Sequence, residues 1–128
     1  MAQSGRFILS VRVLVLLARD PAAMITSAAI AEELGESAVM VRRLFPPLHK
    51  AGLIAQKKGP SGGAKLLVGP KSIGLGDVYS AIEPDWFIAG PSEAEKPLAS
   101  AFKKLRANTI EAMNETTIAS IARKTKKA

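Results

Sequence analysis

The segment between residues 28 and 68 constrains the fold of this chain more than any other stretch of its sequence. It contains a short helical pattern, a tight turn at Gly35-Glu36, a second helical pattern with Arg42 and Arg43, and two short strand patterns. A glycine-rich turn at residues 59–63 separates the strand patterns and predicts a basic hairpin. This order of elements is that of a winged helix-turn-helix, in which the second helix fits the major groove of DNA.

Residues at the helix ends support this interpretation. Ser27 and Ser37 are expected N-caps, because a serine hydroxyl accepts a hydrogen bond from an amide of the first helical turn. Gly35 is expected to end the first of the two helices in the left-handed conformation. Pro46-Pro47 lacks two amide protons inside the second pattern, so we expect that helix to kink or restart after Phe45.

The positive charge of the chain is concentrated in the same segment. The 128 residues include 18 Lys and Arg and 11 Asp and Glu, which gives a net charge of +7. Residues 36–71 contain seven of the basic residues and one acid, Glu36, and therefore carry six of the seven net charges. A basic segment that coincides with a helix-turn-helix predicts a polyanionic partner, and double-stranded DNA suits this fold. A basic face that serves only solubility is the alternative.

The residue types exclude several kinds of chemistry. The sequence contains no cysteine and one histidine, His49. Disulfides, and zinc sites or iron–sulfur clusters held by cysteine, are therefore excluded, and we expect neither a cofactor nor a metal site. We do not expect an enzyme, because catalysis needs convergent polar groups and the acidic residues here are scattered over helical patterns.

An apolar helix is expected near the start of the sequence, from about Gly5 to Arg19, with Ser4 as its N-cap. Arg12 interrupts the apolar residues, and the run is shorter than the roughly 20 residues that a membrane span needs. The small-residue cleavage site of a signal peptide does not follow it. We therefore expect a helix buried in the core of a cytoplasmic protein that has no membrane partner.

The sequence after residue 83 predicts a linker and an appended helix, which divides the chain into residues 1–83, 84–96 and 97–128. Between Pro97 and Met113, apolar residues recur at every third or fourth position. Such a narrow stripe suits pairing with the same helix of a second subunit. A helix folded back on its own domain is the alternative. A short last helix is expected from about Glu115 to Lys124. The residues expected at the dimer interface are Leu98, Ala101, Phe102, Leu105, Ala112 and Met113.

Several motifs together resemble the IscR/NsrR family of bacterial transcription regulators. These motifs are Ser27–Ala31, Val41-Arg42-Arg43-Leu44, Leu48–Ile54, Gly59–Ala64 and Ile73–Tyr79. The resemblance is close over residues 6 to 83. The long helix resembles the family only as a kind of element. The resemblance implies a mainly α fold with a small β-hairpin wing and a long C-terminal dimerisation helix. It also implies a homodimer that binds a semi-palindromic operator, in most members as a repressor.

The resemblance implies which residues contact DNA. It places Ser37, Val39, Met40 and Arg43 in the major groove and Lys58 at the wing tip, where many members have an arginine. This difference predicts a weaker minor-groove contact. Arg42 is also expected in the major groove, because either Arg42 or Arg43 could form a bidentate contact with guanine. The residues expected at the wing and the phosphates are Lys57, Lys58, Ser61 and Lys65.

Sensing members of the family hold an iron–sulfur cluster with three cysteines in the loop before the long helix. The corresponding residues here, Pro84–Lys96, include none, so the resemblance implies DNA binding and dimerisation without cluster sensing. Tyr79, Trp86 and Phe87 are then candidates for the pocket of an unidentified small-molecule effector. A simple packing role between helices is the alternative for these three aromatic residues.

Two other functions use the same fold. A winged-helix module for protein–protein interaction would present its basic wing to an acidic partner without sequence-specific DNA binding. An RNA-binding protein fits less well, because the chain lacks the aromatic platforms on which single-stranded bases stack.

Overall fold

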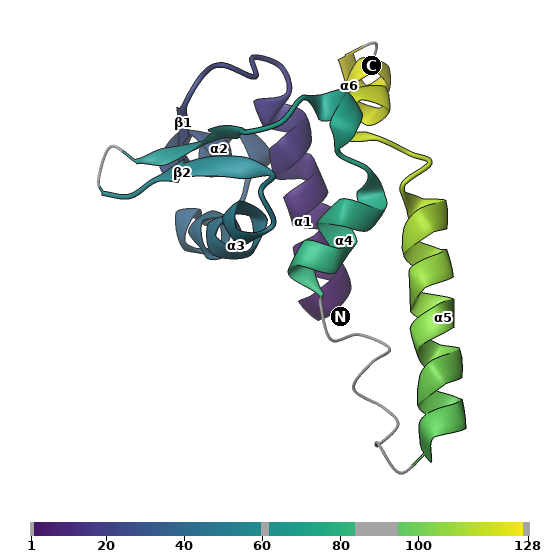
Figure 1. Cartoon of the computed structure of the whole chain (residues 1–128). Coiled ribbons are helices and arrows are strands. Elements are labelled where there is room, and N and C mark those ends of the chain that lie inside the picture. The colour runs from purple at the N-terminus through teal and green to yellow at the C-terminus, as the bar shows by residue number, and fades with distance from the viewer. Residues whose placement is uncertain (1, 60–61, 84–94, 127–128) are drawn as a thin grey trace.

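The computed structural model describes residues 2–59, 62–83 and 95–126 (Figure 1). Most elements are helices, and a small antiparallel sheet lies at one side of the molecule, which confirms the predicted mainly α fold. Within the described ranges, no helix has the length and apolar character required to cross a membrane. The elements in chain order are α1 (Ala2–Leu17), β1 (Ile25–Thr26), α2 (Ser27–Leu34), α3 (Ala38–Lys50), β2 (Ile54–Lys57), β3 (Gly63–Leu66), the 3-10 helix η1 (Pro70–Ser72), α4 (Leu75–Ile82), α5 (Lys96–Met113) and α6 (Ile118–Lys126).

Helix α1 runs through the centre of the molecule, and α2, α3, α4 and α6 all pack against it. Residues 13–17 are all buried, because neighbouring elements cover this helix on more than one side. The expectation of a buried first helix is therefore confirmed. The helix begins at Ala2, so Ser4 lies within it and the expected N-cap is wrong. Arg12 lies on the exposed side, 3.6 Å from the carboxylate of Glu36, and ties α1 to the turn after α2.

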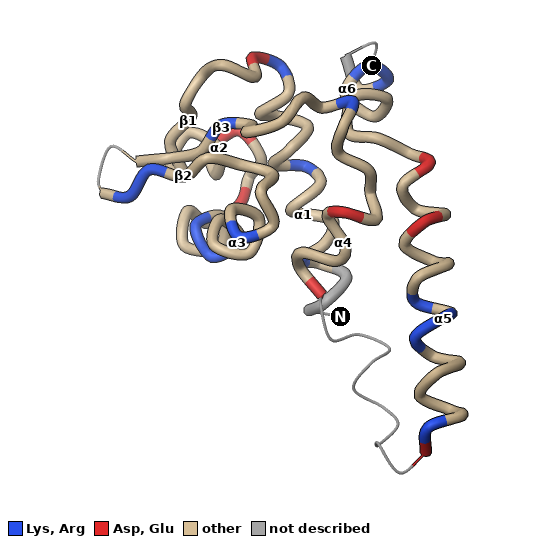
Figure 2. Tube along the Cα trace, viewed as in Figure 1, with Lys and Arg blue, Asp and Glu red and all other residues tan. Residues whose placement is uncertain are grey.

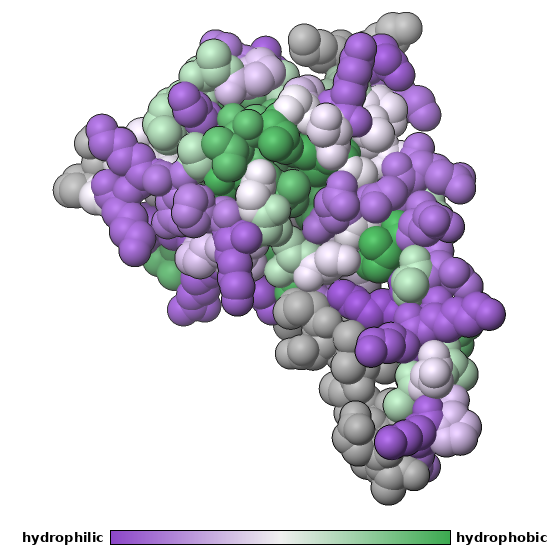
Figure 3. Space-filling model, in the orientation of Figure 1, coloured by the Kyte–Doolittle hydropathy of each residue, from purple (hydrophilic) through white to green (hydrophobic). Residues whose placement is uncertain are grey.

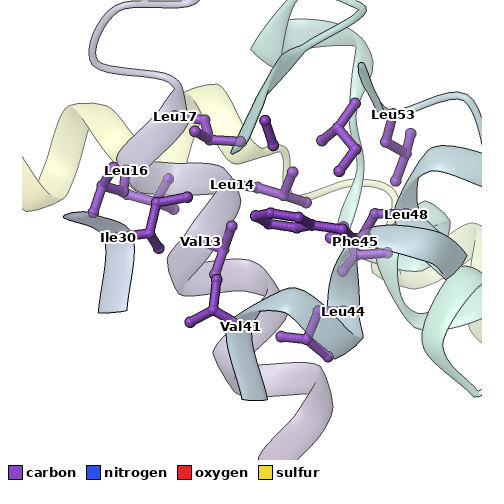
Figure 4. Close-up of a cluster of buried hydrophobic side chains, with 14 of the residues drawn as sticks. Val13, Leu14, Leu16, Leu17, Ile30, Val41, Leu44, Phe45, Leu48 and Leu53 are labelled. Carbon is purple, nitrogen blue, oxygen red and sulfur yellow. The ribbon is translucent and has the colours of Figure 1, made fainter. Parts of the chain in front are cut away.

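Helices α2 and α3 form the helix-turn-helix. The apolar face of α3 lies against α1, where Val41 and Phe45 are close to Val13 and Leu14 (Figure 4). The buried residues of α3 are Val41, Leu44, Phe45 and Leu48, which recur at the spacing of one helix face. This packing fixes which side of α3 faces away from the protein.

Two of the three expected caps in this motif are confirmed and one is wrong. The Ser37 hydroxyl accepts a hydrogen bond of 3.0 Å from the amide three residues later, and Gly35 ends α2 with a φ of 69°. The N-cap of α2 is Thr26, whose hydroxyl accepts a hydrogen bond of 3.1 Å from an amide of the first turn. Ser27 is instead the first residue of the helix and is buried. Strand β1 causes this difference, because it delivers the chain to α2 with Thr26 in an extended conformation.

Helix α3 continues without interruption through Pro46-Pro47, so the expected restart after Phe45 is wrong. The two prolines leave the carbonyls of Arg42 and Arg43 without amide partners inside the helix. Both arginines and Pro46 are exposed, so these carbonyls lie on the solvent side, where water can satisfy them. The buried face of α3 on α1 meanwhile keeps both halves of the helix aligned.

The sheet has the strand order β1-β3-β2 and is antiparallel throughout. Strands β2 and β3 form the predicted hairpin, with Ile54 opposite Leu66 at the base. The third strand, β1, has two residues and pairs with β3. Gly63 permits this pairing, because a side chain at that position would collide with the backbone of Ile25. The wing is thereby fixed to the start of α2.

The two C-terminal helices pack on different parts of the protein. Helix α5 lies beside α4 and extends away from the other elements, whereas α6 returns to pack on α1 (Figure 1). Ile118 at the start of α6 is fully buried, and its amide donates a hydrogen bond of 2.8 Å to the carbonyl of Ile73. Asn114, just after α5, accepts a hydrogen bond of 2.9 Å from the amide of Asp77 in α4.

Candidate nucleic-acid interface

Helix α3 and the wing present their basic residues at the same edge of the molecule. Figure 2 shows Lys and Arg along α3 and at the end of β2, on the side remote from α5. Hydrophilic side chains cover this edge in Figure 3. Because α3 buries its apolar face on α1, its remaining side chains face outward next to the wing. This arrangement gives a protruding helix and a protruding hairpin on one basic surface.

The first turn of α3 contains three of the residues expected in the major groove. Ser37 is exposed, and its hydroxyl is used in capping the helix. Val39 is 50% exposed, which suits an apolar contact with a thymine methyl group. Met40 is half-buried and lines a cavity of about 460 Å³ with Ile8 and Leu9 of α1. Val39 therefore points outward, whereas Met40 is turned toward α1.

Arg42 and Arg43 are both exposed, but their surroundings differ. The Nη1 group of Arg42 donates a long hydrogen bond of 3.4 Å to the hydroxyl of Ser27 in α2. Arg43 is rotated by about 100° from Arg42 around the helix axis, and it has no hydrogen bond or ion pair with the described residues. The contact of Ser27 with Arg42 could not be found from the sequence, because it depends on how α2 packs on α3.

The register of the strands decides which lysines of the wing lie on the same face of the hairpin. Ala55 lies opposite Lys65, and Lys57 follows two residues after Ala55, so Lys57 and Lys65 share one face of the hairpin. Lys57 and Lys58 are exposed, and Lys65 is half-buried. The opposite face of the hairpin joins the core through residues such as Ile54 and Leu66. Ser61 lies outside the described residues.

Of the three aromatic residues proposed for an effector pocket, the structure describes only Tyr79. Its ring packs edge-on against Phe7 of α1, with centroids 5.4 Å apart, and the guanidinium of Arg106 in α5 lies 6.0 Å from its centroid. Partial burial raises the pKa of the Tyr79 hydroxyl, while the charge of Arg106 opposes this shift. Tyr79 therefore connects three helices. Trp86 and Phe87 lie outside the described residues, so the effector pocket stays a prediction.

The six residues expected at a dimer interface lie on two sides of α5. Phe102 and Met113 are half-buried on the face that they share with Arg106, which is turned to α4. None of the described residues of α5 is buried. The other four residues are exposed: Leu98 at 45%, Ala101, Leu105 at 52% and Ala112.

Comparisons with known proteins show that this chain matches a known family. The model of the Rrf2 family, described as an iron-dependent transcriptional regulator, matches residues 4–124. The transcriptional regulator IscR of Aliivibrio salmonicida is 43% identical over 54 residues, which are 42% of this chain and 32% of that protein. IscR of Vibrio cholerae is 39% identical over the same length. The match thus spans about a third of the length of these curated relatives.

Solved structures match over nearly the whole chain. The crystal structure of CymR from Staphylococcus aureus is 26% identical, has a TM-score of 0.66, and is matched over 92% of this chain and 95% of that one. CymR, the global cysteine regulator of B. subtilis, has a TM-score of 0.68 at 23% identity over 92% of this chain and 93% of that one, which shows the shared fold. The fold and the family match together confirm the resemblance to IscR-type regulators. The chain belongs to the Rrf2 family of transcriptional regulators.

Proposed function

We propose that this chain binds DNA as a homodimer, recognises a semi-palindromic operator and represses transcription from it. The observation that carries this proposal is the exposed side of α3 next to a basic wing, with six of the seven net charges of the chain in residues 36–71. A helix that protrudes from an apolar scaffold can enter the major groove, and the adjacent hairpin then reaches the minor groove. Family membership supports the same function.

We assign the DNA contacts by their geometry. Val39 and Arg43 point away from the protein and are placed to meet base edges in the major groove. Lys57, Lys58 and Lys65 carry charge to the phosphates, which adds affinity but little sequence information. Met40 supports α3 from the side of α1 rather than reading bases.

Dimerisation is proposed from the exposed apolar side of α5. An 18-residue helix without a buried residue among those described leaves much apolar surface in water, and Leu98 and Leu105 are about half exposed. A second copy of the same helix would cover this stripe by two-fold symmetry. Two α3 helices would then meet two half-sites on one face of the duplex, about 34 Å apart.

The iron dependence in the family description does not fit the residues of this chain. The sequence contains no cysteine, and the described residues include no group of three His, Cys, Asp or Glu that could hold a metal ion. Thiolates are the usual ligands of iron–sulfur clusters. We propose that this chain regulates transcription without a resident cluster, in response to another signal or to its own abundance.

Selection of duplexes from a random-sequence pool with the purified chain tests the proposed function. We expect enrichment of a semi-palindromic sequence whose half-sites are separated by about one helical turn or a multiple of it. Footprinting on the selected duplex should protect both half-sites. Retention of duplexes without enrichment of any sequence would limit the function to non-specific binding, and no retention at low salt would refute DNA binding.

A further inference from the structure

A small cavity lies between α3 and the turn end of the wing. Its volume is about 160 Å³, which is room for several water molecules at about 30 Å³ each. A tetrahedral phosphate group therefore fits within it. The residues that line the cavity include Ser27, Arg42, Phe45, Lys57, Lys58 and Gly62.

We infer that this cavity binds one phosphate of the DNA backbone and that Arg42 is a phosphate-binding residue rather than a reader of bases. The inference rests on the proposed DNA binding and adds a site to it. The inference also gives the two neighbouring arginines of α3 different roles. Arg42 binds a phosphate, and Arg43 faces the base edges.

The charges around the cavity favour an anion. Arg42, Lys57 and Lys58 all line it, and the described lining residues include no carboxylate. The positive charges of these three side chains repel each other in a small space. A bound phosphate would offset this repulsion, because its negative charge attracts all three. Arginine suits phosphate well, because its planar guanidinium presents several donors at once.

Ser27 directs Arg42 into this position. The serine is 8% exposed, and its hydroxyl accepts the hydrogen bond of 3.4 Å from Nη1 of Arg42. Only one guanidinium donor is used in this contact, so the others remain available for a phosphate. Ser27 is also the first residue of α2, an eight-residue helix whose N-terminal end attracts negative charge.

The location agrees with the path of DNA on a winged helix. When α3 lies in the major groove and the wing lies in the adjacent minor groove, the sugar–phosphate backbone between the two grooves must cross between them. The cavity lies at this crossing, with Arg42 and Phe45 from α3 on one side and β2 on the other. Gly62 keeps the wing narrow there, because a side chain at this position would collide with the backbone carbonyl of Lys57.

The first experiment measures how salt weakens binding of the full chain to a random-sequence duplex of about three helical turns. Arg42→Ala and Lys57→Ala should each reduce the slope of log K against log salt by about one for each bound subunit. Ser27→Ala keeps every charge and should weaken binding by about two- to fivefold, because Arg42 loses its support. Circular dichroism of each variant verifies that the fold is intact.

Matched controls separate a defined site from general charge. Arg123→Ala in α6 and Lys104→Ala in α5 remove the same charges from exposed positions that are remote from the wing. These variants should leave the slope unchanged. An equal loss of slope in the controls, or an unchanged slope in Arg42→Ala and Lys57→Ala, overturns the inference. If the wild-type chain retains no duplex even at low salt, the proposed function itself fails.

The second experiment distinguishes phosphate contact from base contact. On the selected operator and on a scrambled duplex, Arg42→Ala should lower affinity by the same factor, because every duplex offers the same phosphates. Arg43→Ala should lower affinity more on the operator. A larger loss on the operator for Arg42→Ala would make Arg42 a base reader and overturn the assignment.

A third measurement identifies the source of the phosphate. Potassium chloride is replaced by inorganic phosphate at constant ionic strength while duplex binding is followed. If the cavity is built for the backbone, wild type and Arg42→Ala should respond alike to this exchange. Weakening of the wild type alone would show that free phosphate and the DNA backbone compete for the cavity, which supports a phosphate site and extends its ligands to free phosphate.

Discussion

Ser37 determines where helix α3 begins. Its hydroxyl accepts a hydrogen bond of 3.0 Å from the Met40 amide, in an extended conformation that separates α3 from the preceding turn. The same turn is held from the other side by Arg12, whose side chain bonds to the carbonyl of Leu34 at 2.9 Å. Single polar contacts therefore fix the direction from which Val39 and the arginines leave the protein.

Replacing Ser37 by alanine removes the acceptor of this cap. We expect Ser37→Ala to lower the free energy of unfolding by about 0.5–2 kcal/mol, as measured by urea denaturation. Ser37→Asp keeps an acceptor at the cap and should retain most of the wild-type stability. Equal stability of the alanine variant and the wild type would show that the cap contributes nothing.

Arg43→Ala tests whether the side chain of Arg43 reads bases. A bidentate arginine contact with guanine is worth about 1–3 kcal/mol of discrimination, so the ratio of operator to scrambled affinity should fall by that free energy. Fluorescence anisotropy on both duplexes measures the ratio. If Arg43→Ala weakens both duplexes equally, Arg43 contacts phosphates and not bases.

Local sequence signals predict the elements of the helix-turn-helix well. Gly35 and the spacing of Val41 with Leu44 define a helix end and a buried face through contacts between near neighbours in the sequence. The error at Ser27 has a different origin, because β1 forms only when residue 25 meets residue 64. The error at Pro46-Pro47 is similar, since packing on α1 holds a helix that local propensity would break.

Pro46→Ala tests this account of α3. Alanine restores an amide to the helix, and Pro46 is exposed, so little packing is lost. We expect the free energy of unfolding to rise by about 1 kcal/mol or more, although alanine also gives the unfolded chain more freedom. Thermal and urea denaturation both measure this change. A lower stability would mean that the prolines support the native helix.

At the scale of the whole molecule, the basic edge and α5 lie at opposite sides. The sequence predicts α5 and its apolar spacing, but not which of its residues face α4 and which face away. That division depends on the joint where Asn114 bonds to Asp77 and where Gly76 has no space for a side chain beside α5. The burial of Ile118 is likewise a long-range effect, because it follows from the return of α6 to α1.

Leu105→Glu tests the proposed dimer. A carboxylate in the exposed apolar stripe of α5 should convert the dimer to a monomer, because a buried interface cannot accommodate two unpaired charges. Light scattering after size-exclusion chromatography measures the mass. Lys104→Glu changes the charge of an exposed neighbour and should leave the dimer intact. A monomeric wild type, or a dimeric Leu105→Glu variant, contradicts this interface.

The salt dependence of operator binding by the wild-type chain tests the central claim most directly, namely that α3 and the wing form one DNA-binding surface. If the dimer makes about 6–10 phosphate contacts, affinity should fall by about 10³–10⁵-fold between about 50 and 200 mM salt, with a linear relation of log K to log salt. Failure to retain any duplex at about 50 mM salt, or binding that does not change with salt, would contradict the account.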